Sequence, residues 1–318
     1  MVTWTREVLL KVAGLALLFA ALLSVDYRAL TLSAAITETP IQVIIFAFVN
    51  TLLLSYFVLS SSWRGWKEWR AAFALLYGMV YLLTAVESVY LGSILPASTV
   101  FSLIINGAIV SSVFSGALVW VLGNKKPDSE ANSHRLRMPT GEWVWKVLLS
   151  ASVYLIIFLV FGGIVYMPIA KLLDPVAFAS EQRMASSAAS LVFPIEFFRG
   201  TLWALFAAPA ILALRFGWKK TGLVTGLLMA VPLTLSQFLS TAETVGLQIA
   251  HSFEIAGANI VFGFLLLWIL NIHSRFVTDK PTRIDSKINV LATPLDASLL
   301  DNQLNICVDV TSENQGSC

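Results

Sequence analysis

The sequence predicts an all-α integral membrane protein, a polytopic helical bundle of about eight transmembrane helices. Two observations predict this fold class. Hydrophobic residues make up 57% of the 318 residues and charged residues only 13%, against roughly 25% charged in an ordinary soluble domain. The uncharged stretches are also long enough to cross a bilayer, whose ~30 Å hydrocarbon core needs about 20 residues of helix. A water-soluble globular fold is excluded.

Eight uncharged stretches are candidate spans, and short polar joints separate most of them. The first follows Arg6 and contains Lys11, so a signal peptide is the alternative reading of this stretch. We favour a membrane helix, because no small-x-small cleavage site follows promptly. In chain order the predicted spans are residues 8–25, 41–62, 71–86, 96–123, 147–170, 200–214, 221–242 and 255–272. The third can extend to residue 87, the sixth back to residue 194 and the eighth back to residue 251.

The spans divide the chain into two four-helix halves, residues 1–123 and 147–273, joined by a charged connector over 124–146. A polar tail follows over 274–318, and its composition predicts disorder. The tripeptide Gly-Trp-Lys occurs at 65–67 and again at 217–219, which invites comparison of the halves. Because each half holds an even number of helices, a duplication would give both halves the same orientation. The alternative is that such residues recur by chance at helix ends.

The basic residues predict the orientation in the membrane, because cytoplasmic loops carry the excess of Lys and Arg. With eight spans, all but four of the 21 Lys and Arg residues fall on one side. The four on the other side are Arg28, Lys171, Arg183 and Arg199. We therefore expect a cell (plasma) membrane protein with the N-terminus and the C-terminus both in the cytoplasm.

The sequence predicts a candidate polar site made of charged and polar residues that lie within or directly beside the predicted spans. An ionisable residue inside a membrane costs at least ~2.5 kcal/mol, and three of the predicted spans are short enough to draw such residues to their outward edges. Two pairs are three residues apart, so each pair shares one face of its helix. The candidate residues are Glu196 with Arg199, His251 with Glu254, Glu87, and Asn259 one or two turns deeper.

The same residues also have structural explanations that require no functional site. Glu196 and Arg199 are also explained as an ion pair on one helix, in which each charge neutralises the other. Acidic groups near a helix N-terminus are favoured by the helix dipole, which also accounts for Glu254. Glu87 is equally explained as the end of its span. The functional reading depends on whether the three helices bring these side chains together.

The sequence names no cofactor and no reaction. The two cysteines, Cys307 and Cys318, lie in the tail, so no disulfide framework holds the body. Phosphate loops of the Walker type, His-Glu-x-x-His and Gly-x-Ser-x-Gly are absent. A formal charge of +2 gives no argument for nucleic acid. The expected partners are the lipid bilayer and, for the tail, a cytoplasmic protein.

One short element resembles a known family. Glu196-Phe-Phe-Arg199-Gly200 is similar to a truncated form of the Glu-Glu-x-x-x-Arg-Gly element of the CAAX-processing glutamate intramembrane proteases. The resemblance covers about six residues. It departs from the family pattern in that Ile195 precedes Glu196, the spacing to the arginine is one residue short, and only His251 is available where the family uses two membrane histidines. No catalytic role is carried over.

Three functions stay open at this stage. The first is a small-solute or proton-coupled carrier with an outward-facing polar site made by the candidate residues. The second is an intramembrane enzyme that uses a glutamate and His251 on a lipid-linked or peptide substrate. The third is a membrane anchor or assembly protein whose tail binds a cytoplasmic partner.

Overall fold

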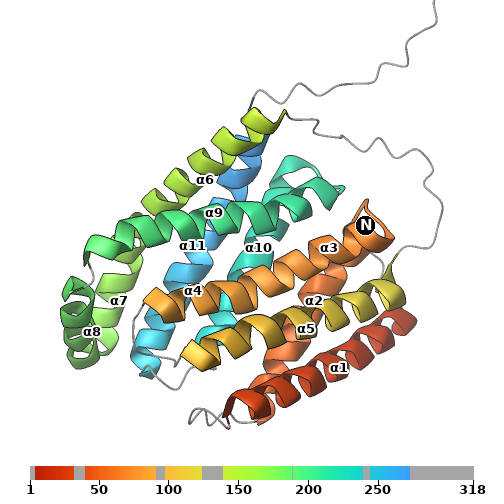
Figure 1. Cartoon of the computed structure of the whole chain (residues 1–318), viewed down its shortest axis with the longest axis horizontal. Helices are drawn as coiled ribbons and strands as arrows, with labels where there is room; N and C mark the ends of the chain where they lie inside the picture. The colour runs from red at the N-terminus through yellow and green to blue at the C-terminus, as the bar shows by residue number, and fades with distance from the viewer. Residues whose placement is uncertain are drawn as a thin grey trace, which may run out of the picture. The chain divides into compact units, whose positions relative to one another are not determined.

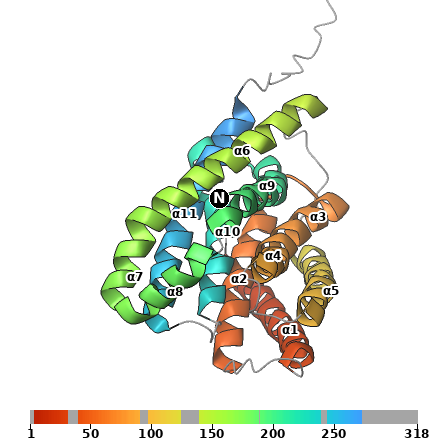
Figure 2. The ribbon, with the colours of Figure 1, turned by 60° about the vertical axis from the view of Figure 1, so that its left-hand side comes forward.

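The computed structural model describes residues 4–31, 40–90, 97–123, 139–187, 189–238 and 244–272. Within these ranges the regular structure is helical, and the helices pack into one bundle, which Figures 1 and 2 show from two sides. The tail over 274–318 and most of the connector over 124–146 lie outside the described residues.

The helices follow the predicted spans in order. The first half comprises α1 (Arg6–Thr31), α2 (Pro40–Ser60), a third span built from α3 (Gly65–Leu76), the π-helix η1 (Tyr77–Leu82) and α4 (Leu83–Tyr90), and then α5 (Ala97–Leu122). The second half comprises α6 (Thr140–Phe161), the π-helix η2 (Gly162–Tyr166), α7 (Met167–Leu173), α8 (Pro175–Ser187), α9 (Ala189–Ala213), α10 (Trp218–Gln237) and α11 (Val245–Asn271).

Seven helical segments of the described residues are long and apolar enough to cross a membrane. α10 is the predicted span that is not among them. It begins with Lys219 and Lys220 after Trp218, and it buries apolar residues such as Leu228 and Met229 inside the bundle. Neighbouring helices cover it, so its lower hydropathy is tolerated. The prediction of an all-α, multi-pass membrane bundle of about eight helices is confirmed.

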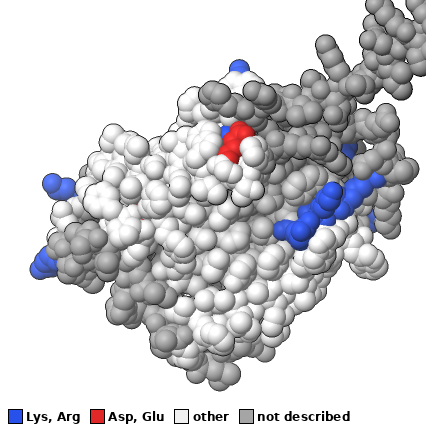
Figure 3. Space-filling model, turned by 45° about the horizontal axis from the view of Figure 1, so that its top comes forward, with Lys and Arg blue, Asp and Glu red and all other residues white. Residues whose placement is uncertain are grey.

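The outer surface of the bundle suits contact with lipid. Large apolar side chains, among them Trp120, Ile164 and Trp268, are exposed. On the face drawn in Figure 3 most of the described surface is uncharged, and charged side chains occupy only a few small areas. A water-soluble protein rarely exposes so much contiguous apolar surface.

Three helices extend beyond the apolar runs that predicted them. α3 begins at Gly65 rather than at residue 71, α9 at Ala189 rather than at residue 200, and α11 at Val245 rather than at residue 255. The predicted starts were wrong because a helix does not have to stop at its first polar residue. Polar side chains in these added turns pack against neighbouring helices, as Glu68, Glu196 and Glu254 do.

Corresponding helices before and after the connector have similar neighbours. α1 packs on α2 and α5, and α6 packs on α9 and α11 in the same way; α3 lies against α5 as α10 lies against α11. Between the halves, α3 contacts α9 and α2 contacts α10. The turns that end α2 and α9 meet in an antiparallel bridge between Ser61 and Leu214, and the Ser62 N–H donates to the Ala213 carbonyl at 2.6 Å.

Matching side-chain contacts accompany this packing. Lys11 pairs with Glu7 at 2.5 Å near the start of α1, and Lys146 pairs with Glu142 at 2.8 Å near the start of α6, each one turn apart on its helix. Further along, an aromatic ring of the first helix of each half meets one of its last helix. These ring pairs are Phe19 with Phe114, at 4.3 Å between centroids, and Tyr154 with Phe262, at 5.2 Å.

α1 is part of the core. Val12, Leu15, Phe19 and Leu23 are buried against the helices around them. Removal of this segment would open the core of the first half to lipid. The packing therefore favours a permanent membrane helix over a cleaved signal peptide.

The closest helix contact involves α10 and α11. A Cβ added at Gly263 would lie 2.5 Å from the Gly226 backbone nitrogen and 2.8 Å from the Gly222 carbonyl oxygen. We expect Gly263→Ala to lower the free energy of unfolding by about 1–3 kcal/mol, because backbone has to move to admit the methyl group. Gly14→Ala is the matched control, since Gly14 in α1 has no atom within 4 Å of the added Cβ. SDS-induced unfolding of both variants measures the difference, and equal effects would contradict the prediction.

Candidate functional site

The site lies where α6, η2 and α7 run antiparallel to α11. Phe262 of α11 packs against Tyr154 of α6. Eight residues later in α6 and eight residues earlier in α11, Gly162 meets Glu254. The residue numbers of the contacting pairs keep one register from Lys146 to Gly162, and the contact after the π-helix η2 is shifted by one residue. Four contacts define it: Lys146 with Leu270, Tyr154 with Phe262, Gly162 with Glu254, and Tyr166 with His251.

A reversal after α7 brings α8 back over this pair. Asp174 leaves the helical conformation, and its Oδ1 accepts a hydrogen bond from the Ala177 N–H at 3.0 Å. This bond caps the start of α8, and Pro175 in its first turn suits a helix start. The Ala177 N–H, helped by the Thr244 hydroxyl, holds the pKa of Asp174 below its ordinary value. Figures 1 and 2 show α7 and α8 side by side at one end of the bundle.

His251 is held by carboxylates on both ring nitrogens. Its Nδ1 lies 3.2 Å from Oε2 of Glu254 on the same helix, and its Nε2 lies 3.5 Å from Oε1 of Glu181 on α8. The ring stacks on Tyr166, with 4.2 Å between centroids and 18° between planes. The Tyr166 hydroxyl donates a hydrogen bond to the Glu181 carboxylate. We call Tyr166, Glu181, His251 and Glu254 the outer polar cluster.

Exposure falls stepwise through the outer polar cluster. The side chain of Glu181 is 34% exposed, that of His251 22% and that of Glu254 8%. Glu254 faces Gly162, where a Cβ would lie 3.4 Å from its Oε1, so a larger residue there would press on the carboxylate. The imidazole therefore connects a carboxylate near the surface with one inside the bundle.

Glu181 lies on α8, outside the candidate spans. Burial raises the pKa of its carboxyl. The hydrogen bonds from His251 and Tyr166 together lower the pKa by more than burial raises it, so the net pKa is below its ordinary value. A group with a lowered pKa stabilises the fold at pH values above its ordinary pKa, and this contribution disappears as the pH falls through the lowered value.

The Glu181 contacts therefore predict a pH dependence. We expect Glu181→Gln to lower the melting temperature at neutral pH and down to about pH 4.3, the ordinary glutamate pKa. At lower pH the difference from the natural protein should shrink, because both side chains are then uncharged. Thermal unfolding in lipid nanodiscs as a function of pH measures this. A difference that stays constant down to the lowest pH would show that the carboxylate charge is not involved.

Glu196 and Arg199 form a separate pair on α9. Arg199 Nη1 lies 3.5 Å from Glu196 Oε1, and Glu196 is buried. Gly200, the next residue, packs against α6, since an added Cβ would lie 2.9 Å from Tyr154 Cβ. This contact sets Glu196 level with about Phe158 of α6, roughly 6 Å along the helix axis from the level of Glu254 at 1.5 Å per residue.

A site shared by the Glu196 and Arg199 pair and the outer polar cluster stays a prediction. Asn259 is buried, and its side-chain NH2 donates to the Ile255 carbonyl of its own helix at 2.9 Å. Glu87 belongs to α4, and its side chain lies outside the described part of the structure.

Two members of the outer polar cluster were not among the predicted site residues. Tyr166 lies near the outward end of a span, where tyrosine is common for reasons of polarity alone. Glu181 lies in the polar outer segment before α9, and nothing in the sequence shows that α8 folds back onto α11. A signal was present in the sequence only for Glu254 and His251, because they are three residues apart.

A buried carboxylate near the start of α3 was not predicted. Glu68 is fully buried, with Ser61, Arg64 and Arg215 around it, and a Cβ at Gly123 of the α5 end would lie 3.2 Å from its Oε2. Glu68 therefore lies where the turns that end α2, α5 and α9 meet.

Within the described ranges no group of three or more His, Cys, Asp or Glu side chains is placed to hold a metal ion. The arrangement at His251 suits another task. An imidazole between two carboxylates can accept a proton on one nitrogen and release one from the other.

Comparison with known proteins adds no relative to this picture. No family model, no curated protein and no solved structure matches the chain.

Proposed function

We propose that this protein is a proton-coupled carrier of a small solute, with the outer polar cluster as its proton-binding site. The observation that carries the proposal is the continuous line from Glu181 through His251 to Glu254, in which each contact is 3.5 Å or shorter. Ionisable residues inside membrane segments commonly mark proton relays in transporters. The decreasing exposure along the line gives the proton a route from outside to a buried carboxylate.

The proton transfer can be followed atom by atom. Glu181 passes a proton to Nε2 of His251, and Nδ1 passes a proton to Oε2 of Glu254, which becomes neutral. The imidazole is then left as the other tautomer, and a ring flip or the reverse transfer resets it. The Tyr166 hydroxyl holds Glu181 in place, and the Tyr166 ring holds the imidazole plane.

The repeated packing of the two halves supports a carrier. The halves share helix neighbours, the two ion pairs of Glu7 with Lys11 and of Glu142 with Lys146, and the Gly-Trp-Lys turns at 65–67 and 217–219. The bridge between Ser61 and Leu214 joins corresponding turns. We infer a duplication about a pseudo-two-fold axis along the membrane normal, the arrangement of parallel repeats in carriers that work by alternating access.

The orientation follows the charge bias. The loops rich in Lys and Arg face the cytoplasm, which puts both termini inside the cell and the outer polar cluster on the outside of the plasma membrane. Single cysteines at exposed positions 183 and 219, in a chain with Cys307 and Cys318 changed to Ser, test this. A membrane-impermeant maleimide should label intact cells at position 183 and not at position 219. The reverse result would invert the topology.

A pH jump tests the function without knowledge of the solute. Proteoliposomes on a solid-supported membrane are switched from about pH 7.5 to about pH 5.5, the range in which histidine changes charge. We expect a transient inward displacement of charge as protons enter the outer polar cluster. Glu254→Gln should reduce it, because the amide cannot take a proton from the imidazole. A displacement equal to that of protein-free vesicles would contradict the proposal.

A further inference from the structure

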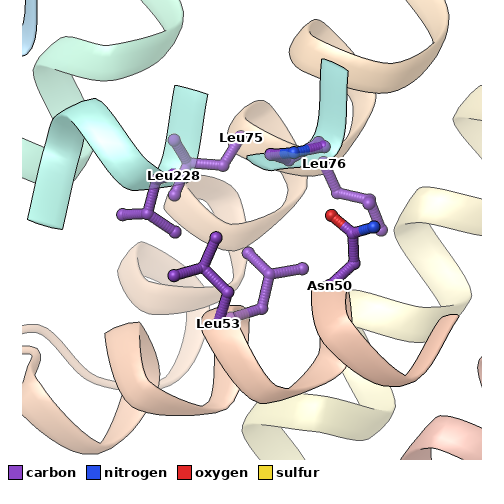
Figure 4. A pocket seen from close by; sticks show the side chains of 7 residues that line it. Asn50, Leu53, Leu75, Leu76 and Leu228 are labelled. Carbon is purple, nitrogen blue, oxygen red and sulfur yellow. The ribbon is translucent and has the colours of Figure 1, made fainter. Parts of the chain in front are cut away.

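A small cavity lies between α2, α3 and α10, at the contact between the two halves. It is lined by Leu53, Leu54, Leu75, Leu76, Leu228, Pro232 and Asn50, and it offers about 10 Å³ of room for the centre of a water-sized molecule. That is about the room that one water molecule needs. Figure 4 shows Asn50 on one side of this group of leucines.

Asn50 brings an unused acceptor to the cavity. Its side chain is 1% exposed. Its NH2 group donates to the Phe46 carbonyl of its own helix at 2.8 Å, whereas its Oδ1 has no hydrogen-bond partner. In Figure 4 this oxygen is on the side that faces the other lining residues. A buried carbonyl oxygen without a donor costs about 1–3 kcal/mol.

Pro232 supplies a second acceptor. Proline has no N–H, so the carbonyl of Leu228, four residues earlier in α10, loses its helical donor. Leu228 and Pro232 both line the cavity, which places this part of the α10 backbone beside it. The Leu228 carbonyl is therefore a candidate second acceptor beside Asn50 Oδ1, and the other lining side chains are apolar.

We propose that this cavity binds a small neutral molecule that donates two hydrogen bonds, one to Asn50 Oδ1 and one to the Leu228 carbonyl. A cation is disfavoured, because no carboxylate lines the cavity and the surrounding leucines would leave the charge without solvation. Two sources offer the required chemistry: a water molecule, and the NH2 group of a primary amide solute. The amide source rests on the carrier function proposed above, whereas the site itself rests on the two acceptors.

The position of the cavity agrees with a binding site in a carrier built from repeats. Asn50 is the middle residue of α2 (Pro40–Ser60), and Leu228 is near the middle of α10 (Trp218–Gln237). The cavity is therefore close to the midplane and between the halves, where carriers made of repeats hold their substrates.

The sign of a stability change tests whether the cavity is occupied. In an empty cavity Asn50→Leu would remove an unsatisfied acceptor and fill space, so the melting temperature would rise. In an occupied cavity the variant loses the bound molecule and its hydrogen bonds, and we expect a fall of about 2–4 °C in lipid nanodiscs. The control is Asn271→Leu, since Asn271 makes the same bond to the carbonyl four residues earlier, at 2.9 Å, at the end of α11.

Two further measurements identify the occupant. A cryo-EM map of the full chain in nanodiscs should show density between Asn50 and Leu228. Urea, which carries two NH2 groups, is the transport probe, and its rate of entry into proteoliposomes is measured. If Asn50→Leu lowers this rate to that of protein-free vesicles, the occupant is an amide. If the variant leaves the rate unchanged, the occupant is water. An empty cavity in the map, or a melting temperature that does not fall, overturns the proposal. The charge displaced by the pH jump depends on His251 and not on Asn50. A failure of the carrier proposal can therefore be distinguished from a failure of the cavity proposal.

Discussion

His251→Gln is expected to reduce the charge displaced by the pH jump about tenfold or more, in line with the effect of removing a proton-transferring side chain. Glutamine can keep a hydrogen bond to Glu254, which lies 3.2 Å from His251 Nδ1, but it cannot take up a proton in this pH range. Glu181 would then have no proton-carrying connection to the buried carboxylate. The solid-supported membrane recording described above measures the loss.

The comparison variants separate proton transfer from mere structural support. Tyr166→Phe keeps the ring that stacks on His251 and removes only the hydroxyl that bonds Glu181, so we expect a partial loss. His273→Gln changes a histidine outside the cluster and should leave the displaced charge unchanged. If His251→Gln retains the full charge while the melting temperature falls, the cluster is a structural element and the carrier proposal is wrong.

The second large effect is expected near the N-terminal end of α6. Lys146 is fully buried; its Nζ donates to the Leu270 carbonyl at 2.7 Å and pairs with Glu142 at 2.8 Å. Its charge lies at the C-terminal end of α11, where the helix dipole favours a cation. Lys146→Met leaves a carboxylate and a helix end without their partner, and we expect a loss of about 2–3 kcal/mol in the free energy of unfolding, since removal of one partner of a buried pair is strongly destabilising.

The chain provides the matched control in its first half. Lys11 pairs with Glu7 in the corresponding place on α1, but both side chains are well exposed, so Lys11→Met should have no measurable effect. SDS-induced unfolding in mixed micelles compares the two variants. Addition of Glu142→Gln to Lys146→Met should recover part of the loss, because it removes the carboxylate left without a cation. Equal losses for the two lysine variants would show that burial is not the cause.

The sequence was sufficient for the membrane fold but not for the helix limits. The scarcity of charge and the length of the uncharged stretches predict about eight helices, because a bilayer accepts little else. The last span was predicted to start at residue 255, or at residue 251 at the earliest, whereas α11 begins at Val245. Glu254 was taken as the edge of a span, but it is buried in the bundle. A hydropathy pattern registers that a residue is polar, but not whether a neighbouring helix covers it.

The same limit applies to the candidate site. The spacing of His251 and Glu254 on one helix face follows from the sequence, because helical periodicity is local. The addition of Glu181 and Tyr166 depends on the turn at Asp174, which folds α8 back onto α11. The cavity at Asn50 depends on three helices distant in sequence. The sequence by itself determined which residues are costly in a membrane; only the tertiary structure decided which of them meet, since contacts between helices are set by packing rather than by position along the chain.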